Sequence, residues 1–526
     1  MLGIAVTLSW VRRKADGRIV PTMIDRLDIQ NFKSFNGRHE VELAPITLVF
    51  GPNSSGKSTL LQSLAVLKQT LEPVRARLDL REPPLALHGE LVDLGSFPAT
   101  VNQHDRDKEL YIGVRFRDRR NRPRKMILAQ RPLYAGLGFG YDEDRRTVEQ
   151  RRCVLGDDDA KVTFVPASKT AKAMSSPFGS VAYRLERGSY QALQSLVKRH
   201  LADVAKPRQG KAREARLQTW LALQGRLNAL IRSGRSLLWF REGFFPTVPD
   251  RGPWIEPNEM AAGVPPQLFD ELWGVRTRAL TELLLGLAYL GPLRDAPRRF
   301  QLLTNEVPTN VGASGEHTAM LLARDQKLQD EVSDWLEQLD IKYRLSVRRV
   351  GGDEVGVELG DLLATTLTDL HNGLAVTPQD VGFGISQLLP VIVQMLVGQR
   401  RTICVEQPEI HIHPGLQAKV GDLLIEAARP GRENQIIVET HSEHLMLRLQ
   451  RRLREGTHKW LTPDQIAVIY VDLDDAGEAH ARRLHLDDQG YFLDEWPQGF
   501  FAERLEELFG GAEVPPRKVS RAQGNA

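Results

Sequence analysis

Cysteine is scarce in this chain of 526 residues, which contains only Cys153 and Cys404. Cys404 falls inside an apolar run that predicts a strand, so a disulfide framework is excluded and a reducing, cytoplasmic setting is expected. Apart from the N-terminal apolar run, which is itself too short, no segment approaches the roughly eighteen consecutive apolar residues of a membrane-spanning helix. Basic residues follow that N-terminal run instead of preceding it, which opposes a secretory signal.

An excess of charge of one sign is also missing, because the formal net charge is only +3 although 26% of the residues are charged. The whole molecule is not a polycation, and any nucleic-acid contact must come from a local patch. Long heptad runs and short-period repeats are absent. An extended coiled-coil tether is therefore not expected. With 41% hydrophobic residues, the chain has the balance of a globular protein with two or three domains.

Strand-like and helix-like patterns alternate along much of the chain. Alternating strand patterns begin at residue 23, and three strand–helix units occupy the segment from about 380 to 450. This order predicts an α/β fold with a mostly parallel core sheet. Between the two parts, short strands with polar turns predict an antiparallel β lobe, and residues from about 186 to 240 predict a helical insertion.

Residues 51–58, GPNSSGKS, match the phosphate-loop pattern G-x-x-x-x-G-K-[ST] between a predicted strand and a predicted helix. Its glycines let the backbone wrap a phosphate chain, and its amides favour an anion. Lys57 would contact the β- and γ-phosphates of ATP, and the hydroxyl of Ser58 would bind Mg²⁺. The expected nucleotide-binding residues are Asn53, Ser54, Ser55, Gly56, Lys57, Ser58 and Thr59.

A phosphate loop also needs an acid at the end of a neighbouring strand. The apolar run TICVE ends at Glu406, which we expect to hold Mg²⁺ directly or through water. The alternative is a strand-end acid in solvent, but the lysine loop creates a need for this partner. ATP and Mg²⁺ are therefore the expected cofactors.

Four motifs together resemble the ABC-type ATPases of the SMC/RecF/OLD group: LDIQNFKSF, GPNSSGKST, VEQPEIHIHP and VETHSEHL. More closely, the chain is similar to stand-alone ATPases with an uncharacterised C-terminal region that occur beside bacterial defence and toxin genes. YLGPLRDAPRRF and DEWPQGFFAERLEELF resemble the same subgroup. The resemblance implies a P-loop ABC-type ATPase fold with the antiparallel β lobe and helical insertion described above.

The resemblance also implies functions for residues outside the phosphate loop. GFGISQ would be the signature loop, with Gly384 and Ser386 reaching the γ-phosphate bound to the other subunit of a homodimer or larger assembly. Ser386 is expected to cap the following helix, and a helix N-terminus favours an anion. His441 would be the switch histidine that touches the γ-phosphate.

Gln407 stands where the group more usually has a second acid, which acts as general base. An amide orients water but does not accept its proton at a useful pKa. Gln407 could orient the water, Glu409 could serve as the base, or the protein could bind ATP tightly and hydrolyse it slowly. We favour a slow enzyme in which Gln407 or Glu409 holds the water. Gln69 and Gln103 are both candidates for the glutamine that positions Mg²⁺.

Six segments are expected along the chain. These are a disordered extension at 1–22, the ATPase N-terminal half at 23–105, a β-rich and helical insertion at 106–280, the ATPase C-terminal half at 281–455, a C-terminal α/β region at 456–510 and a disordered tail at 511–526.

The expected function is an ATPase that dimerises around ATP and regulates a separate effector, a nuclease or toxin, in bacterial anti-phage defence. The alternative is a DNA-repair ATPase of the RecF/SMC type that binds DNA through the basic stretch 198–216; a solvated helical hairpin is the simpler interpretation of that stretch. A transporter subunit is opposed by the atypical signature loop. A nuclease built in cis on the acids around 472–488 and a zinc site at His411 and His413 are both disfavoured.

Overall fold

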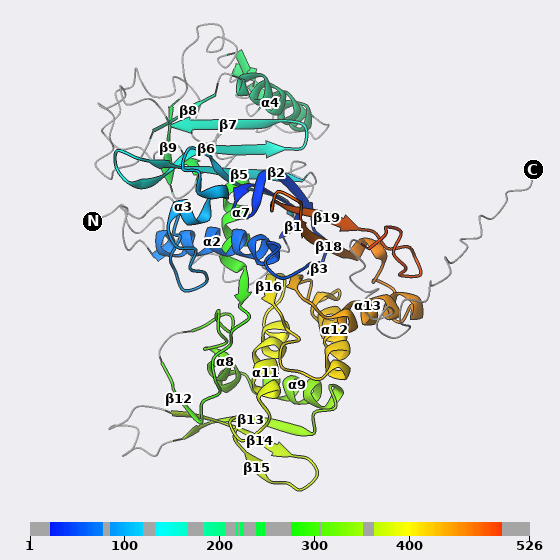
Figure 1. Ribbon diagram of the computed structural model, residues 1–526. Helices are drawn as coiled ribbons and strands as arrows, with labels where there is room; N and C mark the ends of the chain where they lie inside the picture. The colour runs from blue at the N-terminus through cyan, green and yellow to red at the C-terminus, as the bar shows by residue number, and fades with distance from the viewer. Residues whose placement is uncertain are drawn as a thin grey trace, which may run out of the picture.

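The computed structural model describes residues 22–76, 85–118, 132–166, 182–186, 188–205, 275–304, 307–350 and 362–496, with short segments between 217 and 247. Figure 1 shows three layers, with a β lobe above, a central parallel sheet, and a smaller mixed lobe below. None of the described helices has the length and apolar character required to cross a membrane.

The central sheet has six strands in the order β11 (Ala288–Leu290), β16 (Thr402–Glu406), β17 (Gln435–Glu439), β3 (Ile46–Phe50), β18 (Ile466–Leu473) and β19 (Ala479–Leu484). All neighbours are parallel except the edge pair β18–β19. Every residue of β3, β16 and β17 is buried, which explains their unbroken apolar runs, because a parallel sheet is covered on both faces.

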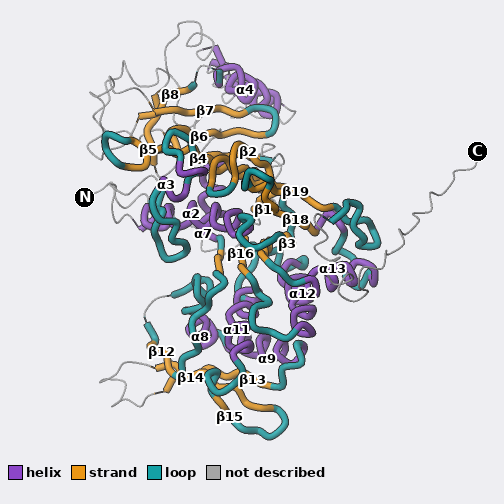
Figure 2. The backbone as a smooth tube through the Cα atoms, in the orientation of Figure 1, coloured by secondary structure: helices purple, strands orange, loops and turns teal. Residues whose placement is uncertain are grey.

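Helices cover both faces of the central sheet (Figure 2). One hydrophobic core contains α2 (Lys57–Ala76), α7 (Val275–Gly286) and the β lobe, and the other contains α11 (Phe383–Leu396), α12 (Pro414–Ala428) and α13 (Glu443–Glu455). Successive residues of β3 enter opposite cores, with Leu48 in the second and Val49 in the first, as the period of two in a strand requires.

The β lobe is a nine-stranded antiparallel sheet. Its order is β10 (Phe245–Thr247), β9 (Leu238–Glu242), β8 (Ala182–Leu185), β7 (Lys161–Pro166), β6 (Thr147–Asp157), β5 (Leu133–Asp142), β4 (Leu110–Asp118), β1 (Thr22–Phe32) and β2 (Phe35–Glu42). The lobe also carries α4 (Ser189–Ala205), α3 (Phe97–Thr100) and the short helix η1 (Asn102–His104). Because β1 pairs with β4, the first ATPase segment and the insertion share one sheet.

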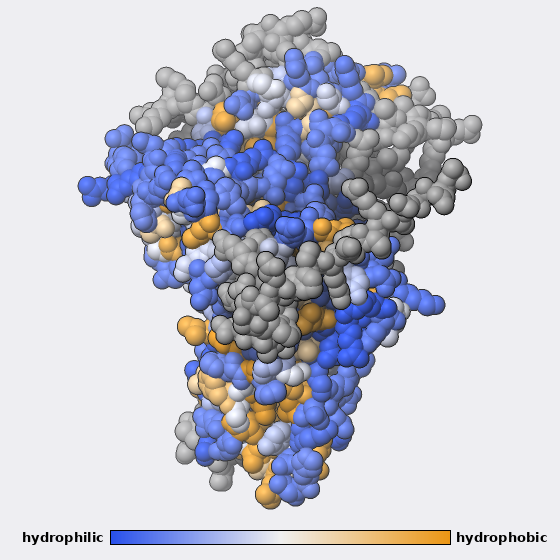
Figure 3. All heavy atoms as spheres, turned by 45° about the vertical axis from the view of Figure 1, so that its right-hand side comes forward, coloured by the Kyte–Doolittle hydropathy of each residue, from blue (hydrophilic) through white to orange (hydrophobic). Residues whose placement is uncertain are grey.

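The lower lobe consists of a small sheet and two helices packed on α11. The sheet joins β12 (Phe300–Leu302), β14 (Leu362–Asp369), β13 (Tyr343–Val350) and β15 (Ala375–Val376), and the helices are α8 (Thr318–Arg324) and α9 (Gln326–Gln338). A short helix η5 (Pro463–Gln465) precedes β18. Figure 3 shows apolar side chains gathered on the surface of the lower lobe.

The predicted α/β class, with a mostly parallel core and an antiparallel β lobe, is confirmed. The strand patterns predicted to begin at residue 23 appear as β1, β2 and β3. Thr22, the last residue of the expected extension 1–22, belongs to β1. The rest of that extension, the expected tail 511–526 and residues 206–216 of the basic stretch lie outside the described residues.

Candidate functional site

The phosphate loop connects β3 to α2 at the carboxyl edge of the central sheet. Lys57 opens α2, so the loop residues before it face the helix N-terminus, where amides favour an anion. Gly56 has a φ of +100°, and an added Cβ would lie 2.4 Å from Oγ of Ser34. This position therefore requires glycine, both for its backbone conformation and for the close approach of the β1–β2 turn.

Lys57 and Ser58, the two side chains expected to contact phosphate and Mg²⁺, are each held by a hydrogen bond. Nζ of Lys57 donates to the carbonyl of Pro52 at 2.5 Å, which keeps the ammonium over its own loop. Burial lowers the pKa of Lys57, and the charge of Glu439 acts in the opposite direction. The hydroxyl of Ser58 hydrogen-bonds the carboxylate of Glu439. The amide of Thr59 donates to the carbonyl of Gly56 within the loop.

Glu439 is a site residue that the sequence-based prediction missed. It ends β17, the strand between β16 and β3, and lies directly opposite Glu406 in the parallel register. Both glutamates are almost fully buried. The signal was present in the sequence, since QIIVE repeats the apolar-run-then-acid pattern of TICVE.

Burial raises the pKa of Glu406 to about 7, and the neighbouring charge of Glu439 acts in the same direction. Burial also raises the pKa of Glu439, although the bond from Ser58 and the charge of Lys57 oppose this shift. Two buried carboxylates side by side repel each other when both are ionised, and a divalent cation would remove that repulsion.

The residues fit a Mg²⁺ ion bound with a nucleotide. Oε2 of Glu439 is buried without a hydrogen-bond partner, and Ser58 adds a hydroxyl oxygen next to it. Oxygen donors are the ligands that Mg²⁺ prefers, and it usually takes only one or two carboxylates from the protein, with water and phosphate oxygens completing the shell. Ser58, Glu406 and Glu439 would supply the protein ligands. When bound, the ion would neutralise phosphate charge.

Gln407, Glu409 and His441 converge just beyond the ends of β16 and β17. The amide of Gln407 donates to the carbonyl of Glu439 at 2.8 Å, and the amide of His441 donates to Oε1 of Glu409 at 2.7 Å. Glu409 is buried, and its carboxylate also hydrogen-bonds the side chain of Thr440. Its observed contacts thus tie the loop after β16 to the loop after β17.

His441 follows the end of β17, where the charge of Lys57 in the phosphate loop acts on its imidazole. Burial lowers its pKa, and the charge of Lys57 lowers it further. The imidazole therefore favours its neutral form at this edge of the sheet. The preceding Thr440 is held by its amide, which donates to the carbonyl of Val49 in β3 at 3.0 Å.

The expectation that Ser386 caps the signature helix is wrong. Helix α11 begins at Phe383 with Gly382 as its N-cap, so Ser386 lies one turn inside the helix. Its hydroxyl donates to the carbonyl of Phe383 at 2.7 Å, and the residue is buried. The capping prediction failed because α11 begins before Gly384. Glycine usually marks the end of a helix, but Gly384 lies inside this one, where the backbone of another loop packs closely against it. A Cβ on Gly384 would lie 2.3 Å from the carbonyl oxygen of His411.

The two candidate glutamines have different surroundings. Gln69 is buried, and its side-chain amide hydrogen-bonds only backbone groups among those described. It donates to the carbonyls of Ala86 and Val92 and accepts from the amide of Val92. Gln103 is exposed at the edge of the β lobe, where it donates to Glu478 at 3.3 Å. Gln103 is the candidate whose side chain is not committed to the backbone.

The YLGPLRD segment contributes Tyr289 and Arg294 to the site. The phenol of Tyr289 donates to Oε1 of Glu406 at 2.5 Å. The guanidinium of Arg294 donates to the carbonyl of Glu406 at 2.8 Å and to that of Gln407 at 3.3 Å. Sequence reasoning used this motif only as a family resemblance, because neither residue stands in a motif with a general chemical meaning.

The residues of the two disfavoured sites have other contacts in the structure. His413 caps α12 by accepting from the amide of Gly415, and His411 packs against the ring of Phe383. Asp472 pairs with Arg482, and Asp474 caps the β18–β19 turn. Across the described residues, no three His, Cys, Asp or Glu side chains are grouped as a metal site.

Two protein-family models match the chain on either side of the middle segment. The model described as "AAA ATPase domain" matches residues 23–206, and the one described as "AAA domain, putative AbiEii toxin, Type IV TA system" matches residues 267–447. The chain is a P-loop ATPase. The two matched segments supply its phosphate loop and its Glu406 strand, and the predicted membership among AAA-type ATPases is confirmed.

The solved structures that match this chain include SMC head domains. A Pyrococcus furiosus Smc head domain bound to the C-terminal domain of ScpA has a TM-score of 0.36 and 13% identity, with 88% of this chain and 96% of that chain covered. The SMC head domain of Thermotoga maritima has a TM-score of 0.33 and 10% identity, covering 88% of this ATPase and 99% of that chain. No curated protein matches the chain.

Proposed function

We propose that this ATPase binds Mg²⁺–ATP between two copies of itself and hydrolyses it slowly, as a switch for a separate effector protein in bacterial anti-phage defence. The observation that carries the proposal is the convergence of one cation, one hydroxyl, two carboxylates and one neutral imidazole at the carboxyl edge of a single sheet. Lys57, Ser58, Glu406, Glu439 and His441 are the residues concerned.

Slow hydrolysis is supported by the side chains around the expected position of the attacking water. Gln407 has no acid–base function at neutral pH, and Glu409 is buried with one oxygen committed to the amide of His441. A slow step of this kind suits a switch, since the ATP-bound state lasts long enough to hold a partner. The phosphate itself would take the proton from the water.

A second copy would complete the site from the start of α11. Gly382, the N-cap, and Phe383, the first residue of the helix, are both exposed, and the amides at a helix N-terminus favour an anion. Ser386 would act only from within the helix, through its bond to the carbonyl of Phe383. The effector, a toxin or nuclease, is proposed because the family model over residues 267–447 carries a toxin–antitoxin description.

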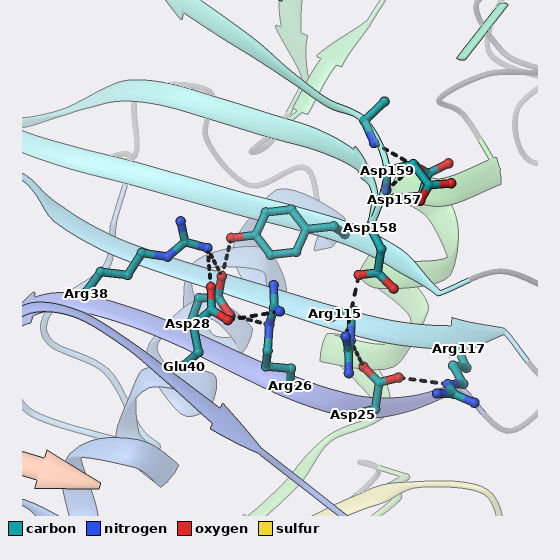
Figure 4. A network of polar contacts seen from close by, with 12 residues as sticks. Asp25, Arg26, Asp28, Arg38, Glu40, Arg115, Arg117, Asp157, Asp158 and Asp159 are labelled. Carbon is teal, nitrogen blue, oxygen red and sulfur yellow. Dashed lines mark hydrogen bonds and ion pairs between the residues drawn. The ribbon is translucent and has the colours of Figure 1, made fainter. Parts of the chain in front are cut away.

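Direct DNA binding is less well supported by the described part of the insertion. Arg199 pairs with Asp157 at 2.9 Å and with Asp159 at 2.7 Å. Figure 4 shows the same pattern across the β lobe, where Arg115 and Arg117 both contact Asp25. Arginines neutralised by carboxylates in this way contribute little to phosphate binding.

The proposed function is tested by ATP turnover and binding of the full chain. We expect less than about one ATP per minute, because a P-loop enzyme that lacks stabilising help turns over at about 10⁻⁴–10⁻² per second. Duplex DNA should leave the rate unchanged. Lys57→Ala should weaken ATP binding by about 10- to 100-fold, since a charged hydrogen bond contributes about 1.5–3 kcal/mol. Strong stimulation of ATP turnover by DNA would favour the repair ATPase. If Lys57→Ala bound ATP with the affinity of the wild type, the nucleotide would bind at a site other than the phosphate loop.

A further inference from the structure

The loop that follows β11 is built against the end of the Glu406 strand. β11 pairs in parallel with β16, with Tyr289 opposite Cys404 and Leu290 opposite Val405. Two backbone bonds then fix the loop, from the amide of Gly291 to the carbonyl of Ala313 at 2.8 Å and from Asp295 to Ser314 at 2.9 Å. Residues 291–295 thus have a defined path next to the metal-site strand.

Arg294 turns from this loop into the protein and donates to carbonyls, and none of the carboxylates in the described residues pairs with it directly. It is buried, its two terminal nitrogens contact the carbonyls of Glu406 and Gln407, and its Nε has no hydrogen-bond partner. Burying a guanidinium is unfavourable unless hydrogen bonds and opposite charges compensate the loss of water. The charges of Glu409 and Glu406 offset part of that cost.

The backbone that Arg294 contacts is itself in an unfavourable conformation. Gln407 has a φ of 45°, in the left-handed region, which costs about 1–2 kcal/mol for a residue with a Cβ. Its amide is held from the other side by the carbonyl of Glu439. The carbonyl of Gln407 accepts from the amide of Ile410 at 3.2 Å and from the guanidinium of Arg294. The carbonyl of Glu406 accepts from Arg294 as well, so Arg294 contacts both carbonyls of this segment.

We infer that Arg294 and Tyr289 are positioning residues for the hydrolytic step. Arg294 holds the peptide that carries Gln407, and Tyr289 fixes the carboxylate of Glu406 through its bond to Oε1. A guanidinium presents its nitrogens as a planar fork and reaches two carbonyls at once, whereas an ammonium is a single point charge. The inference deepens the proposed function and rests on it, because it concerns hydrolysis at Glu406 and Gln407.

Arg294→Lys tests the arginine, since it keeps the positive charge and removes the fork. We expect kcat for ATP to fall at least tenfold, while KM for ATP stays within about twofold, because misplaced groups affect the transition state more than ground-state binding. Arg298→Lys is the matched control in the same loop, where the side chain is 73% exposed, and it should keep the wild-type kcat. Equal kcat values for the two variants, or a rise in KM alone, would overturn the inference.

Tyr289→Phe tests the second residue and covers the case in which Arg294→Lys does not fold. It keeps the ring in the core and removes only the hydroxyl. We expect the Mg²⁺ concentration that half-maximally enhances binding of a fluorescent ATP analogue to rise at least threefold, with binding in EDTA unchanged. Tyr343→Phe, on the lower lobe, should leave both values unchanged. An unchanged Mg²⁺ requirement in Tyr289→Phe contradicts the inference.

These outcomes are distinct from failure of the proposed function. If the wild-type chain hydrolyses ATP without dimerising, the switch proposal fails, but the ratio of wild-type to variant kcat still tests Arg294. If Lys57→Ala retains wild-type turnover, the proposed ATP site is wrong, and the inference fails with it.

Discussion

Replacing Glu406 by glutamine should stabilise the nucleotide-free protein, and more so at pH 8 than at pH 5. Burial raises the pKa of Glu406 from 4.5 to about 7 in the folded state, whereas the bond from Tyr289 and the charges of Lys33 and Arg294 act against this shift. A carboxyl with a raised folded pKa binds its proton more tightly in the native protein than in the unfolded chain. The penalty for ionising it in the fold is therefore absent well below pH 4.5, grows as pH rises, and is complete above pH 7.

The magnitude follows from the gap between the two pKa values, which is about 2.5 units, from 4.5 to about 7. Each unit corresponds to about 1.4 kcal/mol. The penalty is therefore about 3 kcal/mol at pH 8 and about 1 kcal/mol at pH 5, where the unfolded carboxyl is only partly ionised. Glutamine is never ionised and keeps an oxygen for the phenol of Tyr289, so Glu406→Gln removes the penalty with little change in packing.

The assay is guanidinium denaturation of the wild type and Glu406→Gln in EDTA at both pH values, followed by far-UV circular dichroism. The midpoint difference between the two proteins should be larger at pH 8. Glu337→Gln is the control, because Glu337 is exposed on α9 and should give the same small difference at both pH values. A Glu406→Gln variant that is no more stable than wild type at pH 8 would refute the reasoning.

Three further outcomes are expected. Glu439→Gln should raise the Mg²⁺ concentration needed for half-maximal ATP binding, with about tenfold as the expected scale for losing one charged ligand, measured against unchanged binding in EDTA. Gly384→Ala should weaken nucleotide-dependent dimerisation in a light-scattering titration, because its Cβ would lie 2.3 Å from the carbonyl oxygen of His411. Glu409→Gln should slow ATP hydrolysis at least as much as Gln407→Ala in a phosphate-release assay. A rate unaffected by Glu409→Gln would exclude Glu409 from the hydrolytic step.

Sequence patterns predicted the parts of this protein whose local chemistry is self-contained. The phosphate loop needs its glycines and Lys57 wherever it occurs, and a parallel strand buried on both faces needs an unbroken apolar run, so the site around β3 and β16 could be predicted. Glu439 followed the same pattern as Glu406, but its importance appears only once β17 is known to lie between β16 and β3.

The features that sequence patterns did not predict depend on contacts between residues far apart in the chain. Arg294 and Tyr289 act on β16 from more than a hundred residues away, a relation that no local spacing encodes. The start of α11 was predicted wrongly for the same reason, because the place of Gly384 depends on its contact with His411 in a different loop.

The most direct test of the account is the mass of the purified protein, measured by light scattering with Mg²⁺ and a non-hydrolysable ATP analogue. The account predicts a dimer with the analogue, a monomer without it, and a monomer for Lys57→Ala under both conditions. A wild-type protein that binds the analogue and remains a monomer would contradict the claim that a second copy completes the ATP site.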